Sequence, residues 1–285
     1  MGGGAARMTV RAAINRLRRD LTIAATLRML LLFGTVAGVT SIAIGPMHHI
    51  NGLAVLTVIA FIWMALMYYS LKGSRLASDS PSLIAAGQLD EAEHRIEAAI
   101  RSFSLSRTVK LLSLHHLAVL RHAQRRWQDS AQLCSALLSQ RLGSIQGLSR
   151  SSLLLLTDDL LQLGDLNGTY QALRRLFQQR LTLAEATTLL QLQLEYLARI
   201  GQWDQLLVGV AAKVQLIELM PTAAAARSQG LMSVAAMHVG RTDLAQWLGQ
   251  RALALSDIET LCTERPVLQE LRRLIPAPQI VANPA

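Results

Sequence analysis

Two apolar segments near the N-terminus constrain this chain more than any other feature of its sequence. Residues 27–47 carry no charge after Arg28, and residues 52–71 carry none at all. Each segment has close to the roughly 20 residues that a helix needs to cross a bilayer. The connection between them is so short that the two helices must run antiparallel. The sequence therefore predicts a transmembrane helical hairpin, in which Pro46 ends the first helix and Asn51-Gly52 forms the turn.

Basic residues flank this predicted hairpin on both sides and are absent from its connecting loop. Short loops that carry Lys and Arg stay in the cytoplasm. The pattern predicts a multi-pass protein of the prokaryotic inner-membrane type, with both termini cytoplasmic and with His48 and His49 outside. A cleaved signal peptide at the first segment is the alternative, although the second segment would still anchor the chain. The basic residues that set this orientation are Arg11, Arg16, Arg18, Arg19, Lys72 and Arg75.

The segment that precedes the first span, residues 1–26, combines arginines with an apolar stripe. Val10, Ile14, Leu17 and Leu21 are spaced as one face of a helix. Two interpretations remain open. The segment either lies as a helix in the plane of an anionic membrane, or it extends the first span into the cytoplasm.

Gly34 and Gly38 form a GxxxG pair inside the first span. Small residues at this spacing let two membrane helices approach closely. The partner that we expect is the second span rather than another subunit, although chance occurrence in a Gly- and Ala-rich span is the simpler alternative.

The net charge of +9 is concentrated in the same N-terminal region. Residues 1–75 contain eight basic residues and one acidic residue, Asp20, so they account for +7. The rest of the chain is nearly neutral, which argues against nucleic-acid binding. Leu and Ala dominate its composition and favour helix over strand.

A six-residue segment, called the turn phrase below, recurs five times in this nearly neutral region. The steps between copies are 38, 39, 37 and 39 residues. Gly suits the left-handed backbone that ends a helix, and a short polar side chain suits the first turn of the next one. The five copies are GQLDEA (87–92), RRWQDS (125–130), GDLNGT (164–169), GQWDQL (201–206) and GRTDLA (240–245).

A helix–turn–helix unit repeated about five times predicts an α-solenoid over residues 72–256, because one pair cannot bury its apolar face alone. A capping helix and a disordered tail are expected over residues 257–285. The whole chain is thus predicted to be all-α. The residues that carry the repeat are Gly87, Leu89, Asp90, Ala92, Trp127, Gly164, Leu166, Asn167, Gly201, Trp203, Asp204, Gly240 and Asp243.

The turn phrase, with a helix on either side, resembles the turn of the tetratricopeptide repeat family, and AGQLDEAE (86–93) matches it best. The resemblance covers residues 78–256, with a period longer than the family's roughly 34 residues. It implies a module that recruits a protein or peptide on its concave face. Arg125-Arg126 and Arg174-Arg175 are candidates for contacting an acidic peptide there, with solvated surface as the simpler interpretation.

No residue pattern points to catalysis, a cofactor or a metal, so we expect a protein that is not an enzyme. Glycine-rich phosphate loops and the GxSxG and HExxH motifs are missing from the sequence. His115, His116 and His122 share one predicted helix without the three or four converging ligands that a metal requires. Asp158-Asp159 is interpreted as a solvated helix edge. Cys134 and Cys262 are interpreted as reduced structural thiols.

These observations favour a membrane-anchored protein-interaction module whose solenoid lies in the cytoplasm. Its expected partners are the lipid bilayer and an unknown protein or peptide. Two alternatives remain: a scaffold that self-associates in the membrane, and an accessory subunit of a transport or envelope-biogenesis complex.

Overall fold

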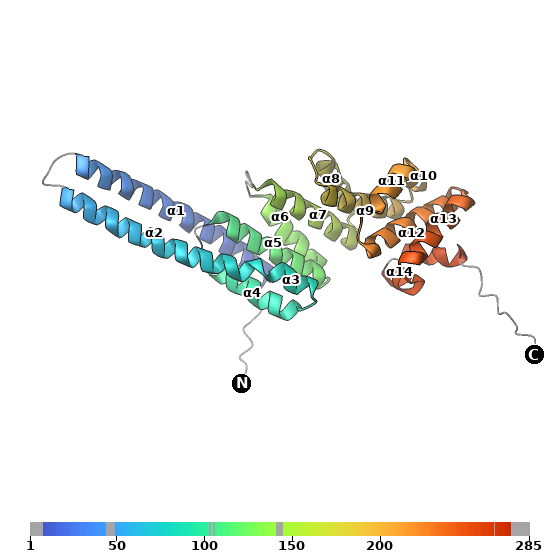
Figure 1. Cartoon of the computed structure of the whole chain (residues 1–285), viewed down its shortest axis with the longest axis horizontal. Coiled ribbons are helices and arrows are strands. Elements are labelled where there is room, and N and C mark those ends of the chain that lie inside the picture. The colour runs from blue at the N-terminus through green and yellow to red at the C-terminus, as the bar shows by residue number, and fades with distance from the viewer. Residues whose placement is uncertain are drawn as a thin grey trace, which may run out of the picture. The chain divides into compact units, whose positions relative to one another are not determined.

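A computed structural model describes residues 8–43, 49–102, 104, 106–140, 145–264 and 266–274. Throughout this described part the chain is helical and contains no strand (Figure 1), which confirms the all-α prediction. The chain divides into two compact units, Met1–Leu163 and Gly164–Ala285. Most of the tail predicted to be disordered, residues 275–285, lies outside the described residues.

The first unit begins with two long helices, α1 (Val10–Ala43) and α2 (His49–Ser78), which pack against each other (Figure 1). By length and composition, Val10–Ile42 could cross a membrane, and Leu53–Tyr68 forms a shorter apolar stretch. The turn predicted at Asn51-Gly52 is wrong, because both residues lie inside α2. Pro46 and His48 lie outside the described residues.

Five further helices complete the first unit, and each contacts the next along the chain. Apolar side chains from several of them form a buried core. The helices are α3 (Ser80–Ala85), α4 (Leu89–Arg101), α5 (Arg107–Ala123), α6 (Trp127–Leu138) and α7 (Gln146–Leu163).

The second unit has its own apolar core. Its central element is α12, which contacts α9, α10, α11, α13 and the C-terminal 3₁₀ helix. The elements are α8 (Leu166–Phe177), α9 (Leu183–Arg199), α10 (Trp203–Leu207), α11 (Val210–Ile217), α12 (Thr222–His238), α13 (Thr242–Leu255), α14 (Ile258–Glu264) and η2 (Pro266–Leu274).

The first residue of every turn phrase has a left-handed backbone. The φ angles of Gly87, Gly164, Gly201 and Gly240 lie between 70° and 79°. Arg125 has a φ of 59° and is the one non-glycine residue with positive φ in the described part of the chain. The second copy therefore keeps the conformation of the turn although it lacks the glycine.

The hydrogen bonds of these turns also repeat. In the first copy, Gly87 N donates to Ile84 O at 3.0 Å and Gln88 N donates to Leu83 O at 2.9 Å. The turns at Arg125, Gly201 and Gly240 repeat this pair of bonds. This is the Schellman arrangement, which satisfies the carbonyls at the end of a helix.

The third and sixth positions of the turn phrase have constant structural roles. The third residue begins the following helix in all five copies, at Leu89, Trp127, Leu166, Trp203 and Thr242. The sixth residue is 0 % exposed in every copy, whether it is Ala92, Ser130, Thr169, Leu206 or Ala245. The helix that follows each turn therefore has a buried side chain at the same position in its first turns.

The helix after the fourth turn phrase is broken, which the sequence pattern did not predict. Gly209 has a φ of 67° and separates α10 from α11. The Lys213 ammonium donates to the carbonyls of Gln205 and Leu206 at 3.1 and 2.9 Å, so it satisfies the end of α10. Burial lowers the pKa of Lys213.

The predicted capping helix at the C-terminus is the 3₁₀ helix η2 rather than an α-helix. Leu268 and Leu271 of η2 are fully buried in the core of the second unit. His238 stacks on Trp203 with ring centroids 4.4 Å apart, and its Nε2 lies 3.0 Å from Glu270 Oε2. His238 of α12 thus contacts both α10 and η2.

Candidate functional site

The polar residues of the turn phrases do not all act as predicted. Asp165 is the N-cap of α8, and its Oδ1 accepts the Gly168 N–H at 2.8 Å. The sequence analysis singled out Asn167 instead, which lies one residue inside the helix. The N-cap residues Gln88, Arg126, Gln202 and Arg241 make no side-chain cap bond. Asp90, Asp204 and Asp243 lie in first turns, where a carboxylate interacts favourably with the helix dipole.

Gly34 and Gly38 of α1 face α2. A methyl group added at Gly34 would lie 2.9 Å from Ile59 Cδ1, and one added at Gly38 would lie 3.0 Å from Leu56. Both glycines therefore allow a close approach of the two helices within one chain.

The apolar stripe of residues 10–21 packs against protein, which makes the in-plane lipid interpretation of this stripe wrong. Val10 and Leu17 are 6 % and 4 % exposed and belong to the same core as residues of α4, α5 and α6. Ile14 and Leu21 pack at its edge. The stripe and the first apolar segment belong to one continuous helix, α1.

Arg16, one of the residues assigned to membrane orientation, also makes a protein contact. Its Nη2 donates to the Arg101 carbonyl at 2.6 Å. Arg11, Arg18 and Arg19 are exposed on α1, and Arg75 is exposed on α2, the helix that also holds Lys72. Of the five arginines assigned to membrane orientation, all except Arg16 therefore have exposed side chains.

A buried ion pair fixes α1 to α5. Lys110 and Asp20 have side-chain exposures of 3 % and 7 %, and Lys110 Nζ lies 2.6 Å from Asp20 Oδ2. The ammonium also donates to the Ile100 carbonyl at 2.8 Å and to the Ser102 carbonyl. Burial lowers the pKa of Lys110, and the hydrogen bond and charge of Asp20 oppose that shift. The single carboxylate of residues 1–75 therefore has a structural partner.

A second buried pair lies in the same unit. Arg121 is fully buried, and its Nη2 lies 2.9 Å from Glu93 Oε1. Gln124 connects the two side chains, accepting from Arg121 at 2.7 Å and donating to Glu93 at 3.1 Å. Breaking a buried pair of this kind leaves an uncompensated charge in the core.

Asp158-Asp159 is not the solvated edge that the sequence suggested. The Asp159 side chain is 0 % exposed, and its Oδ1 lies 2.7 Å from His122 Nδ1. Burial raises the pKa of Asp159, and the hydrogen bond from His122 opposes that shift. His122 also packs edge-on against Trp127 with centroids 4.7 Å apart. The arrangement links α5, α6 and α7.

No group of three or more His, Cys, Asp or Glu side chains suited to a metal occurs within the described ranges. His115 Nδ1 lies 3.0 Å from Ser152 Oγ, and burial followed by the neighbouring His116 lowers its pKa to about 4. Cys134 and Cys262 are free and buried, and burial raises the pKa of Cys134, which keeps it a protonated thiol.

A groove of about 390 Å³ lies between α8, α9 and α10 in the second unit. Four α8 positions, spaced by one helical turn, give one wall, and α9 gives the other. Tyr170 of α8 stacks on Tyr196 of α9 with ring centroids 6.4 Å apart. Tyr170 and Phe177 are 49 % and 58 % exposed although they are large aromatic side chains. The groove is lined by Tyr170, Leu173, Arg174, Phe177, Gln193, Tyr196, Leu197, Ile200, Gln202 and Gln205.

The polar groups of this groove are available to a ligand. Among the described residues, Arg174 is the one charged residue that lines it, and the Arg174 guanidinium makes no hydrogen bond or ion pair there. The side-chain amides of Gln193, Gln202 and Gln205 also make no hydrogen bond within the described part of the chain. The floor is apolar, because Leu173 and Leu197 are buried beneath the rings. Exposed aromatic rings, one free guanidinium and three free amides form a surface that can take up an apolar side chain and a carboxylate together.

Arg174-Arg175 was predicted from the sequence as a candidate binding pair, whereas the rest of the groove was not. Arg174 lines it, whereas Arg175 is exposed but does not. The signal available in the sequence was the spacing of Tyr170, Leu173, Arg174 and Phe177 on one helical face. Arg125 and Arg126 lie in the turn between α5 and α6, and Arg126 pairs with Asp129.

No protein-family model, curated protein or solved structure matches this chain.

Proposed function

We propose that this protein is a membrane-anchored interaction module. In this proposal residues 27–71 form a transmembrane hairpin, and a cytoplasmic solenoid similar to tetratricopeptide repeats binds a segment of a partner protein. The observation that carries the binding function is the groove between α8 and α9, with its exposed aromatic rings and available Arg174.

Three observations support the membrane anchor. Large apolar side chains such as Phe33, Phe61 and Met64 are 65–73 % exposed on α1 and α2, an arrangement that is unfavourable in water. The two glycines of α1 let the helices approach closely, as in membrane helix pairs. Basic residues lie before the first span and after the second, at the same end of the hairpin, and favour a cytoplasmic location for that end.

The solenoid assignment is supported by the equivalence of the five turns. Each has a left-handed first residue, a helix that begins at the third and a fully buried sixth residue. A spacing of 37 to 39 residues between such turns is what stacked helix pairs produce.

The proposed ligand of the groove is a peptide segment with a carboxylate close to an aromatic or large apolar side chain. Aromatic residues and arginine supply most of the binding energy in protein interfaces. A guanidinium can bind a carboxylate through two parallel hydrogen bonds. The glutamine amides can pair with the peptide backbone, which would otherwise lose its hydrogen bonds to water.

A charge reversal at Arg174 tests this function, with Arg175→Glu as a matched control. Full-length wild-type protein and both variants would be captured from native membranes, and the co-purified proteins would be quantified. We expect a partner whose recovery falls at least tenfold in Arg174→Glu and stays at the wild-type level in Arg175→Glu. Equal capture by all three proteins would contradict the role of the groove.

A further inference from the structure

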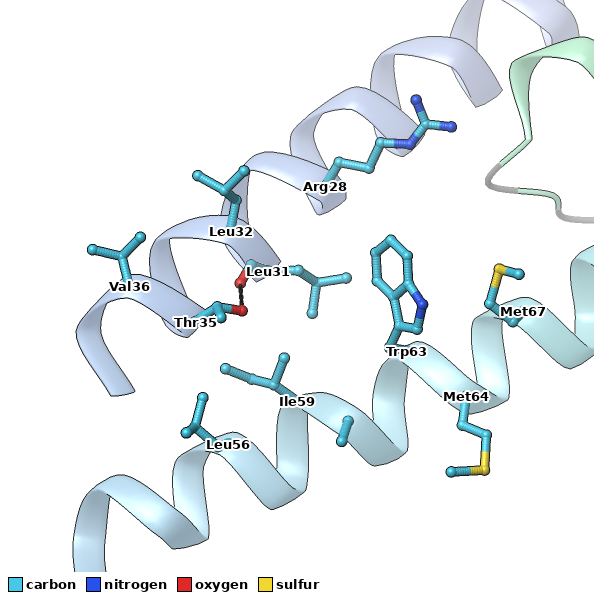
Figure 2. Close-up of a pocket in the computed structure, with 11 residues that line it drawn as sticks. Arg28, Leu31, Leu32, Thr35, Val36, Leu56, Ile59, Trp63, Met64 and Met67 are labelled. Carbon is cyan, nitrogen blue, oxygen red and sulfur yellow. Dashed lines mark hydrogen bonds between the residues drawn. The ribbon is translucent and has the colours of Figure 1, made fainter. Parts of the chain in front are cut away.

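A second groove lies between α1 and α2 and has a different chemistry. Its volume is about 940 Å³, and its walls are almost entirely apolar (Figure 2). Leu31 and Ile59 face each other across it, and Trp63 projects between the two helices. The Thr35 hydroxyl donates to the Leu31 carbonyl at 2.7 Å, so this polar group is already satisfied.

Arg28 is the one charged residue among the described residues that line this groove, and it lies at one end of the groove (Figure 2). The groove extends on α1 from Arg28 to Val36, which is about 12 Å at 1.5 Å per residue. In the orientation proposed above, Arg28 lies at the cytoplasmic end of the first span. That is the depth of the headgroups of the cytoplasmic leaflet, where anionic lipids gather.

We propose that this groove binds an anionic phospholipid, with its phosphate at Arg28 and an acyl chain along the apolar walls. The inference rests on the proposed membrane hairpin. A guanidinium binds phosphate through paired, charge-assisted hydrogen bonds. The acyl chain contributes little selectivity, because bulk lipid is as apolar as the groove. The preference for an anionic headgroup therefore comes from Arg28.

A second copy of the chain fits this groove less well than a lipid does. Copies inserted in one orientation carry Arg28 at the same depth, so a close symmetric pair would bring like charges together. The small residues that favour helix contact, Gly34 and Gly38, already face α2 of the same chain.

The fluorescence of Trp63 tests the proposal, because this ring lines the groove. The full-length protein would be reconstituted in vesicles that contain brominated phosphatidylglycerol or brominated phosphatidylcholine as quencher. The Trp63→Phe variant isolates the signal of this ring from the other three tryptophans. We expect quenching by phosphatidylglycerol with about fivefold higher apparent affinity than by phosphatidylcholine.

The Arg28→Gln variant should abolish this preference, whereas Arg75→Gln, on α2 and outside the groove, should retain it. Equal quenching by the two lipids in the wild type would overturn the lipid site and leave the membrane hairpin intact. A preference that survives in Arg28→Gln would overturn it as well. Absence of quenching by either lipid would overturn both the lipid site and the membrane hairpin.

Discussion

The ammonium group of Lys110 lies 2.6 Å from Oδ2 of Asp20, and the two residues are 90 positions apart in the sequence. The pair connects α5 to the first turns of α1, inside a core that α1 shares with α4, α5 and α6. The helix proposed to enter the membrane is therefore part of the folded first unit and not a flexible tether. In the proposed function, this shared core holds the folded first unit in a fixed orientation to its membrane anchor.

Removal of the charge of Asp20 should destabilise the first unit strongly. Asp20→Asn leaves Lys110 buried without its counter-ion, and such a loss costs about 3–5 kcal/mol. The exposed pair of Glu91 and Arg95 provides the control, because Glu91→Gln should cost less than about 1 kcal/mol. The free energy of unfolding would be measured in detergent by chemical denaturation. Equal effects of the two substitutions would contradict a structural role for the buried pair.

Arg125→Gly should stabilise the protein. A left-handed backbone costs a non-glycine residue about 1–2 kcal/mol, and glycine removes this cost. Glycine also makes the unfolded chain more flexible, which lowers the stability by about 0.4–1 kcal/mol. We expect a net gain of about 0.5–1 kcal/mol, measured by thermal unfolding. Arg125→Ala removes the same side chain but keeps the strain, so it should change the stability little.

The reverse substitution, Gly201→Ala, should cost about 1 kcal/mol. The added methyl group meets no atom within 4 Å, so the cost comes from the backbone alone. A gain in stability from Gly201→Ala would contradict the left-handed turn.

Stability should fall with pH as the medium is acidified from pH 7 to pH 5, in part because of His115. Its pKa in the folded protein is about 4, below the ordinary value of 6.5. The unfolded chain therefore binds more protons in this window, and acidification favours unfolding by roughly 1–2 kcal/mol. His115→Gln should reduce this slope, whereas His94→Gln, at an exposed position, should not. Unfolding midpoints at pH 7, 6 and 5 would measure the difference.

Gly38→Ile should weaken the packing of α1 on α2. The added side chain would enter the space held by Leu56 and Val55, and overpacking of this kind costs about 1–3 kcal/mol. Ala37→Ile, at the exposed neighbouring position, is the matched control. A disulfide between cysteines introduced in α1 and α2 would report the contact. Unchanged cross-linking in Gly38→Ile would show that the glycine does not set the distance.

The turns between helices could be predicted from the sequence, because their conformation depends on single residues. Gly87, Gly164, Gly201 and Gly240 are recognisable because few other residues adopt a left-handed backbone. Arg125 could be placed only by its spacing from Gly87 and Gly164. The break at Gly209 was missed, because an isolated glycine within a helical pattern is usually tolerated.

Long-range partners could not be read from the sequence. The stripe at Val10 and Leu17 has the same pattern whether it faces lipid or protein, and only the fold shows that it packs on α4–α6. Asp159 looked like a surface residue until His122, 37 positions away, proved to be its partner. The α8–α9 groove needs Tyr196 and Arg174 from two different helices, and no local motif connects them.

The most direct test of the central claim is site-specific photo-cross-linking in native membranes. A photoreactive residue at Tyr170 lies in the groove, and one at Gln171 is exposed on the same helix outside it. The proposed function predicts a discrete cross-link from position 170 to a different membrane-associated or cytoplasmic protein. This cross-link should be missing from position 171 and lost when Arg174→Glu is added. Cross-links only between copies of this chain would contradict the account. A cross-link from position 170 that persists in the Arg174→Glu variant would contradict it as well.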